Sequence, residues 1–164
     1  LVVQRVRSAT VSVDGRPPTA PGIPRRPRRS ALRREVARIG QGLLALVGFS
    51  AQEGPETGPT MAQRLVKLRI FDDEQGRLNR SLQDVQGELL LIPQVTLTAS
   101  LAKGTRPSFH TAAAPEAARG LFEAFVRAVQ AIYPKPKVAA GLFQARMVVT
   151  LENDGPVTFV LDEP

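Results

Sequence analysis

The sequence predicts an α+β fold, with mostly antiparallel strands in a barrel-like sheet arrangement and two or three helices. Short apolar segments rich in β-branched residues alternate with turn signals along the 164 residues, which is typical of strands joined by hairpins. Two longer segments repeat their apolar residues at helical spacing. Apolar residues make up 43% of the chain, enough for the core of one domain at this length.

The first elements are two strands, Leu1–Val6 and Ala9–Val13, in which β-branched residues alternate with polar ones. We expect a break at Arg7-Ser8 and a turn at Asp14-Gly15. Residues 16–34 then carry five prolines and seven arginines, so they bury too little apolar surface to offset their ordering entropy. We expect a flexible Pro/Arg-rich insertion at 16–34 within a single domain, 1–164, with Ser30–Arg38 able to form a short helix.

The rest of the chain alternates strands with two helices. The apolar run Ile39–Phe49 predicts one buried strand. A helix is expected from Thr60, a candidate cap, to Leu68, and another from Pro115, well placed as a first helical residue, to Ile132. The other predicted elements, in order, are an extended segment at 69–71, a turn at 72–76, a loop or short strand at 78–85, strands at 88–98 (interrupted by Pro93), 138–143 and 147–152, a turn at 153–156 and a strand at 157–161.

Composition narrows the possible chemistry. The chain has no cysteine and one histidine, His110, which excludes disulfides, thiol nucleophiles and multi-histidine metal sites. No apolar run approaches the roughly 18 residues of a membrane span, and we see no secretion signal. We therefore expect a cytoplasmic protein with no membrane partner, no metal and no cofactor.

The positive charge is concentrated in one segment. The net charge of +7 equals that of Arg16–Arg38, which holds eight arginines and one acid, Glu35. Such a run can attract phosphate backbones through counterion release. It is more often a solvated loop.

Several motifs occur together in a characteristic order. Three carry most of the information: Gln4-Arg5-Val6, Pro93-Gln94-Val95-Thr96-Leu97 and Asn153-Asp154-Gly155-Pro156-Val157-Thr158. Lesser matches are Gly40-Gln41-Gly42-Leu43, Leu68-Arg69-Ile70-Phe71, Arg106-Pro107-Ser108-Phe109 and the stretch from Phe143 to Met147. In this order and spacing they resemble the D-aminoacyl-tRNA deacylase family, over nearly the whole chain except Arg16–Arg34. The resemblance implies a homodimer of single deacylase domains that binds aminoacyl-tRNA and hydrolyses the ester between a D-amino acid, or glycine, and the 3′-terminal adenosine.

The resemblance implies that Gly155 and Pro156 form the chiral selectivity motif. In the family this dipeptide enters the site of the other subunit, typically with a cis peptide bond, and blocks an L side chain. The arginine matched by Arg5 supports it. X–Pro is the bond at which cis costs only about 0.5–1 kcal/mol, and glycine permits close backbone approach. On local sequence alone, the same residues predict a turn between two strands.

The resemblance also implies that Gln94 and Thr96 form the catalytic segment. They match the family pattern Ser-Gln-Phe-Thr-Leu, whereas Pro93 stands in place of Ser and Val95 in place of Phe; both are expected to line the substrate pocket. The family mechanism is thought to use the 2′-hydroxyl of the terminal ribose. Thr96 is thus expected to shape the pocket or orient the ester, since no neighbouring base is visible to activate it as a nucleophile.

Phe143 and Met147 match family residues that contact the substrate end, and they complete the predicted substrate pocket. Both are equally compatible with a place in the core. Gln144 and Arg146 replace a usual small residue and a usual aspartate. The acidic turn at 72–74 is expected to be solvated rather than to bind a metal.

Two alternatives stay open at this point. A related deacylase with relaxed specificity would remove L-alanine from mischarged tRNA, and Pro93 favours it because a branch with Pro-Gln at this point has that activity. A non-catalytic tRNA-binding protein would use Arg16–Arg38 for affinity.

Overall fold

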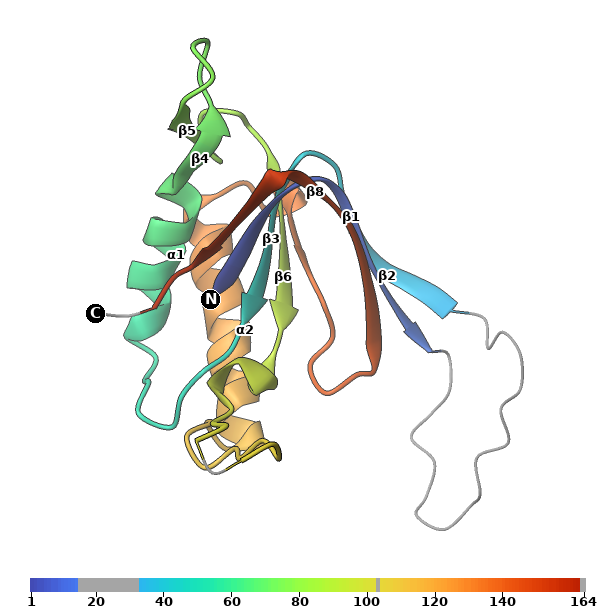
Figure 1. The fold of residues 1–164 in the computed structure, drawn as a ribbon, viewed down its shortest axis with the longest axis vertical. Helices are drawn as coiled ribbons and strands as arrows, with labels where there is room; N and C mark the ends of the chain where they lie inside the picture. Colours follow the sequence, from blue (N-terminus) through green and yellow to red (C-terminus); the bar gives the residue numbers. More distant parts are fainter. Residues whose placement is uncertain (15–32, 103, 163–164) are drawn as a thin grey trace.

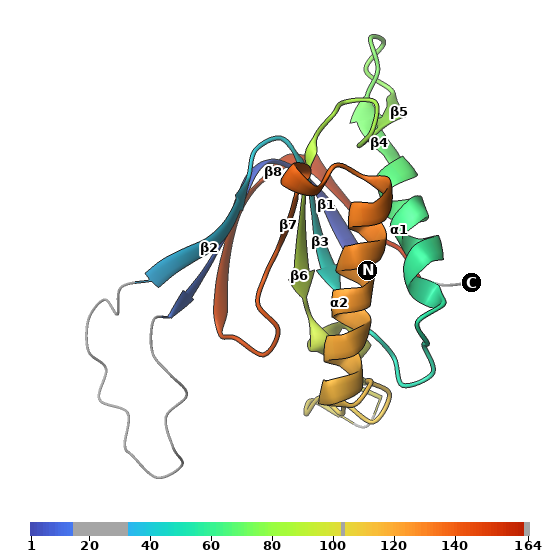
Figure 2. The ribbon, with the colours of Figure 1, turned by 180° about the vertical axis from the view of Figure 1, so that it is seen from behind.

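A bent, mixed sheet with two helices on one side forms the structure, a computed structural model that describes residues 1–14, 33–102 and 104–162 (Figures 1 and 2). The larger sheet contains β1 (Val2–Asp14), β2 (Arg33–Ile39), β3 (Gly42–Val47), β6 (Glu88–Pro93), β7 (Val138–Ala140) and β8 (Met147–Val160). A separate hairpin contains β4 (Arg69–Asp72) and β5 (Leu78–Ser81), and the helices are α1 (Thr57–Lys67) and α2 (Pro115–Ile132).

Strand β1 organises the sheet, because β2, β3 and β8 all pair with it antiparallel. Strand β2 also contacts β6 and β7, so the bent sheet nearly closes on itself. The predicted α+β class and barrel-like arrangement are confirmed. However, β3 pairs parallel with β6, and β6 with β7. These two connections are crossovers that contain α1 and α2, rather than the hairpins we expected.

Both faces of the central strands are buried. Leu43, Ala45 and Val47 of β3 belong to the core beneath the helices, together with Phe125 of α2. The alternate residue Leu44 points into a second core inside the bend of the sheet. This alternation explains why the segment is a nearly continuous apolar run, since a strand buried on both faces needs apolar residues at every position.

Several predicted boundaries in the first half are wrong. Strand β1 runs through Arg7-Ser8, where its pairing with β8 shifts register, so the expected break is a bulge within one strand. Residues 33–39 form strand β2 on β1, not part of a helix, because the ladder to β1 satisfies their backbone groups. The run Ile39–Phe49 contains the end of β2, a bend and β3. Residues 15–32, which hold most of the expected insertion at 16–34, lie outside the described residues.

The second half shows similar differences. Helix α1 begins at Thr57, three residues before the predicted cap. Strand β6 ends at Pro93, and the short 3₁₀ helix η1 (Val95–Thr98) replaces the predicted strand continuation, since proline cannot donate to a ladder. Strand β7 stops at Ala140, whereas β8 continues through the predicted turn at 153–156. Within the described parts of the chain, neither helix is long and apolar enough to cross a membrane.

Candidate functional site

The tip formed by Gly155-Pro156 is anchored by a buried arginine. The Gly155-Pro156 peptide bond is cis. Arg5, whose side chain is only 7% exposed, donates from Nε to the carbonyl oxygen of Asp154 at 3.0 Å and pairs with its carboxylate at 3.3 Å. A hydrogen bond from a charged donor is among the stronger hydrogen bonds in proteins. The structure therefore places Arg5 where the sequence predicted support for this tip.

A side chain of β8 itself, that of Asn153, also holds the tip. The backbone N–H of Val157 donates to the Asn153 side-chain oxygen at 2.8 Å, across Gly155 and Pro156. The Asn153 amide also donates to the hydroxyl of Thr158 at 3.3 Å. The side chain of Asn153 thus supplies a partner that the backbone lacks at this irregular point, which lets β8 resume pairing with β1 after the tip.

Arg5 also ties the tip to the β4–β5 hairpin. Its Nη1 donates to the carbonyl of Ile70 at 2.9 Å and lies 3.3 Å from the carboxylate of Asp72. Asp72 was expected to be one of several solvated acids, and its pairing with Arg5 was missed. Sequence separation hid the contact: an acidic residue after a strand has no local sign of a partner 67 positions earlier in the chain.

Gln94 and Thr96 lie together at the carboxyl end of β6. The backbone N–H of Gln94 donates to the carbonyl of Val47 at 2.7 Å, which holds the start of η1 against β3. The Gln94 side-chain amide donates to the Thr96 hydroxyl. Thr96 is exposed. Among the described residues, the side chain that hydrogen-bonds to the Thr96 hydroxyl is the Gln94 amide. An amide cannot act as a base that removes the proton of that hydroxyl.

The predicted pocket residues fall into two groups. Met147 and Pro93 flank Gly141: a Cβ there would meet the Met147 sulfur at 2.9 Å and the Pro93 Cδ at 3.3 Å. Phe143 instead packs against Phe122 of α2, with ring centroids 6.4 Å apart. Val95 is exposed, on η1 beside Thr96. The structure therefore assembles Pro93 with Met147 and places Phe143 against α2.

One chain does not bring the two halves of the predicted site together. Arg5 pairs with Leu43, and Leu43 with Leu89, so the tip lies level with the start of β6. Gln94 is five residues further along, about 16 Å on a strand. Within the described residues, no hydrogen bond or ion pair joins Gly155-Pro156 to the segment 94–96. The Gly155-Pro156 tip therefore lies apart from the Gln94–Thr96 segment of its own chain.

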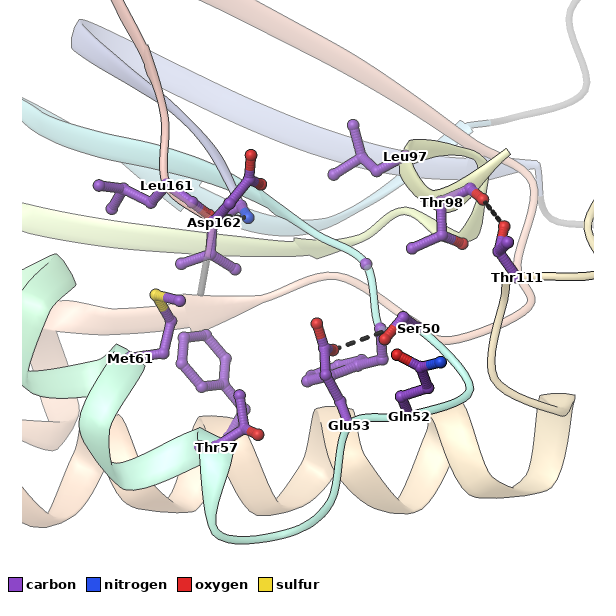
Figure 3. Close-up of a pocket in the computed structure, with 15 residues that line it drawn as sticks. Ser50, Gln52, Glu53, Thr57, Met61, Leu97, Thr98, Thr111, Leu161 and Asp162 are labelled. Atoms are coloured by element: carbon purple, nitrogen blue, oxygen red, sulfur yellow. Dashed lines mark hydrogen bonds between the residues drawn. The ribbon is translucent and has the colours of Figure 1, made fainter. Parts of the chain in front are cut away.

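A cavity adjoins the Gln94–Thr96 segment. Its volume is about 600 Å³, and Leu97 and Thr98 form one wall with Leu161 and Asp162 (Figure 3). The opposite wall comes from the β3–α1 loop and the start of α1, where Glu53 accepts a hydrogen bond from the Ser50 N–H at 3.1 Å. Our sequence interpretation included Leu97 in a motif but did not predict this cavity or its other lining residues. The usable signal was a glycine and an aromatic residue, Gly48-Phe49, directly after the buried strand.

Gly48 sets the close approach of η1 to β3, and we expect Gly48→Ala to displace η1. A Cβ on Gly48 would lie 2.8 Å from the carbonyl oxygen of Gln94 and 3.0 Å from the Leu97 Cβ. Such overpacking lowers folding stability by about 1–3 kcal/mol, which urea denaturation measures. We also expect about a tenfold loss of kcat/KM for the ester hydrolysis that the resemblance implies, because catalysis is sensitive to small displacements of the site. A hydrolysis assay measures this second loss.

Gly58→Ala is the matched control for Gly48→Ala. Gly58 also lines the cavity, but a Cβ there would meet only the Phe125 Cα at 3.8 Å, an ordinary contact. Hydrolysis by Gly58→Ala should match the unmodified chain. Equal losses of hydrolysis in the two variants would show that filling the cavity, and not displacing η1, lowers the activity.

The described residues hold no group of three or more His, Cys, Asp or Glu side chains able to bind a metal ion. The groups seen at the site are the exposed hydroxyl of Thr96, the side-chain amide of Gln94 and the backbone N–H of Gln94. Such groups can orient an ester and stabilise charge on its carbonyl oxygen.

Comparisons with known proteins agree with the motifs. The family model described as "D-Tyr-tRNA(Tyr) deacylase" matches residues 2–162. The D-aminoacyl-tRNA deacylase of Geobacter sp. (strain M21) is 43% identical over 163 residues, covering 99% of this chain and 96% of the relative. That of Ectopseudomonas mendocina (strain ymp) is 44% identical over 162 residues, covering 99% and 98%.

Solved structures share the fold over nearly the full length. A structure described as "c-Myc DNA Unwinding Element Binding Protein" has a TM-score of 0.84 at 33% identity, covering 99% of this chain and 97% of the other. A probable eukaryotic D-amino acid tRNA deacylase has a TM-score of 0.76 at 17% identity, covering 96% and 95%, which supports the fold alone. The family predicted from the motifs is confirmed: this chain belongs to the D-Tyr-tRNA(Tyr) deacylase family.

Proposed function

We propose that the chain hydrolyses the ester that links a D-amino acid, or glycine, to the 3′-terminal adenosine of tRNA, and that it rejects L-aminoacyl-tRNA. Two relatives that are 43% and 44% identical over 99% of this chain bear the name D-aminoacyl-tRNA deacylase. The observation that carries the chiral part of the proposal is the tip Gly155-Pro156, held by the buried Arg5. A backbone wall held from within the fold can reject one hand of a substrate by steric clash.

Thr96 acts in this proposal as a hydrogen-bond donor. A hydroxyl that accepts from the Gln94 amide keeps its own proton available to donate. Water adds to the ester carbonyl carbon, the bond to the 3′ oxygen breaks, and the amino acid leaves the tRNA. Thr96 would donate to the carbonyl oxygen on which negative charge develops. The 2′-hydroxyl of the ribose adjoins the 3′ ester and relays the proton: it gives its own proton to the departing 3′ oxygen and takes one from the attacking water, because neither the Gln94 amide nor the Thr96 hydroxyl is placed or basic enough to do so.

The cavity beside η1 is the proposed place for the terminal adenosine. Its volume of about 600 Å³ suits a small-molecule site. Phe49 and Leu97 offer apolar surface for the base, and the carboxylates of Glu53 and Asp162 offer acceptors for the exocyclic amine. A nucleoside bound there would direct its 3′ ester along η1 towards Thr96.

The active unit in this proposal is a homodimer. Because the tip lies about five residues along the sheet from Gln94 in its own chain, we infer that Gly155-Pro156 of one copy completes the site of the other. Val95, the apolar neighbour of Thr96, is 39% exposed. A second copy would cover it.

Heterodimers test this composite site. Thr96→Ala and Gly155→Ala chains would be co-expressed with different tags, and the mixed dimers isolated by purification on both tags. Each mixed dimer has one site with both elements intact, so it should recover about half of the unmodified activity, while each parent variant is nearly inactive. Inactive heterodimers would show that both elements act within one chain.

Pro93 supports a second candidate, a deacylase that also removes L-alanine from mischarged tRNA. Pro93 ends β6 beside Met147, where it offers neither the hydroxyl nor the backbone N–H of a serine. Hydrolysis of D-Tyr-, Gly- and L-Ala-tRNA measured in parallel separates the candidates. Release of L-alanine at a rate near that of D-tyrosine would favour the second. If none of the three amino acids were released, the result would support the non-catalytic alternative and refute the enzyme proposal.

A further inference from the structure

Arg119 of α2 makes two contacts with the loop that connects β7 to β8. Its guanidinium carbon lies 5.0 Å from the centroid of the Phe143 ring. Its Nη2 donates to the side-chain oxygen of Gln144 at 2.7 Å. Phe122, three residues later on the same helix face, packs on the same ring. One turn of α2 therefore holds two consecutive residues of this loop.

The loop needs such support because of its backbone. Gln144 has φ of +60°, a left-handed conformation that residues with a side chain adopt at a cost. The conformation persists where surrounding contacts fix it, and two are visible here: the Ala145 N–H donates to the Leu142 carbonyl at 3.3 Å across the turn, and Arg119 donates to the Gln144 side chain. The loop residue Gly141 lies beside both Pro93 and Met147, the first residue of β8. A shift at Gln144 would therefore move side chains at the edge of the proposed substrate pocket.

We propose that Arg119 is a positioning residue for ester hydrolysis: it fixes the Phe143 ring and the left-handed turn at Gln144, and so sets the wall against which the amino-acid end of the substrate binds. The inference rests on the proposed function and on the prediction that Phe143 and Met147 contact the amino-acid end of the substrate in its pocket, while the Phe143 ring is held from behind by α2. Arg119 itself lies outside that pocket and acts through the loop.

A different role for an exposed arginine is a contact with tRNA phosphate, which would also lower activity when removed. The two roles differ in the substrate they need. A phosphate contact matters only for tRNA, whereas a positioned loop matters equally for a substrate without phosphates. The small ester 3′-O-D-tyrosyl-adenosine therefore separates them.

The experiment compares Arg119→Ala and Arg119→Lys with the unmodified chain on D-Tyr-tRNA and on 3′-O-D-tyrosyl-adenosine. We expect Arg119→Ala to raise KM about fivefold on both substrates, the combined effect of an exposed cation–π contact and one hydrogen bond. Arg119→Lys should recover part of the loss, since it keeps the charge but not the planar donor. In a Phe143→Leu background, the effect of Arg119→Ala should shrink, because the two residues act as a unit.

Arg127→Ala is the matched control, an exposed arginine on the same helix. It removes the same charge and should leave KM on the small ester unchanged. A loss on D-Tyr-tRNA alone would assign Arg119 to phosphate binding and overturn the inference, as would equal KM values for Arg119→Ala and the unmodified chain. Failure of the unmodified chain to hydrolyse either ester would refute the proposed function and the inference with it.

Discussion

Gly155→Ala should lose about a hundredfold in the rate of D-Tyr-tRNA hydrolysis, because small displacements of substrate-positioning groups have effects of that order. Gly155 has φ of +132°, a conformation that L side chains rarely adopt. A Cβ there would lie 2.6 Å from the Val157 Cγ2 and 3.0 Å from the Val157 nitrogen. The tip must therefore move, and the Asn153 side chain that spans it would lose its hydrogen bond to Val157. Single-turnover hydrolysis measures the loss.

Backbone strain alone could also weaken the variant, at a cost of about 1–3 kcal/mol in folding stability. Gly76→Ala separates strain from position. Gly76 has φ of +73° in the β4–β5 turn, and a Cβ on it would meet no atom within 4 Å. This control variant should lose a similar amount of stability by urea denaturation and keep full activity. A fully active Gly155→Ala would show that the tip does not take part in hydrolysis.

Local sequence patterns predicted most elements well, because they depend on local physics. The helix from Pro115 to Ile132 was placed at both ends, since proline favours its first turn and the apolar stripe fixes its length. The continuous apolar run over β3 indicated a strand buried on both faces. In the structure, Leu43 and Leu44 point into different cores, as such a run requires.

The errors arose where distant partners decide the local structure. Residues 153–156 carry strong turn residues, yet β8 passes through them because β1 pairs with β8 on both sides. Residues 33–38 have helix-compatible side chains, but β1 offers them an edge to pair with. Pairing with a strand far away in sequence overrides local propensity, and no local window contains it.

The same distinction between local patterns and distant partners applies to the candidate site. Gln94, Thr96, Arg5 and the Gly155-Pro156 tip were all predicted from motifs. The residues that hold the site residues in place were not predicted. Asp72 contacts Arg5, and Arg119 contacts Phe143. In the sequence, Asp72 and Arg119 look like ordinary surface charges. The cavity beside η1 was missed for a related reason, since its lining residues come from six separate parts of the chain.

Arg5→Ala should lower the free energy of unfolding by about 3 kcal/mol, because two hydrogen bonds from a charged donor are lost at a buried position. Their acceptors, the carbonyls of Asp154 and Ile70, lie 3.0 and 2.9 Å from the guanidinium. The ion pairs add less, since the carboxylates of Asp72 and Asp154 are 51% and 25% exposed and regain water. Urea denaturation measures the loss.

The same variant should hydrolyse D-Tyr-tRNA about a hundredfold more slowly, since Arg5 links the tip to the β4–β5 hairpin. Arg5→Lys should recover little, because one ammonium cannot replace a planar group that reaches two carbonyls. Arg7→Ala is the control: Arg7 also pairs with Asp154, at 3.1 Å, but its side chain is 68% exposed. Its removal should cost at most about 0.5 kcal/mol and leave the rate unchanged. If Arg5→Ala proved as mild as Arg7→Ala, the Asn153 side chain and the β1–β8 ladder would suffice to hold the tip, and burial of Arg5 would have no part in forming the site.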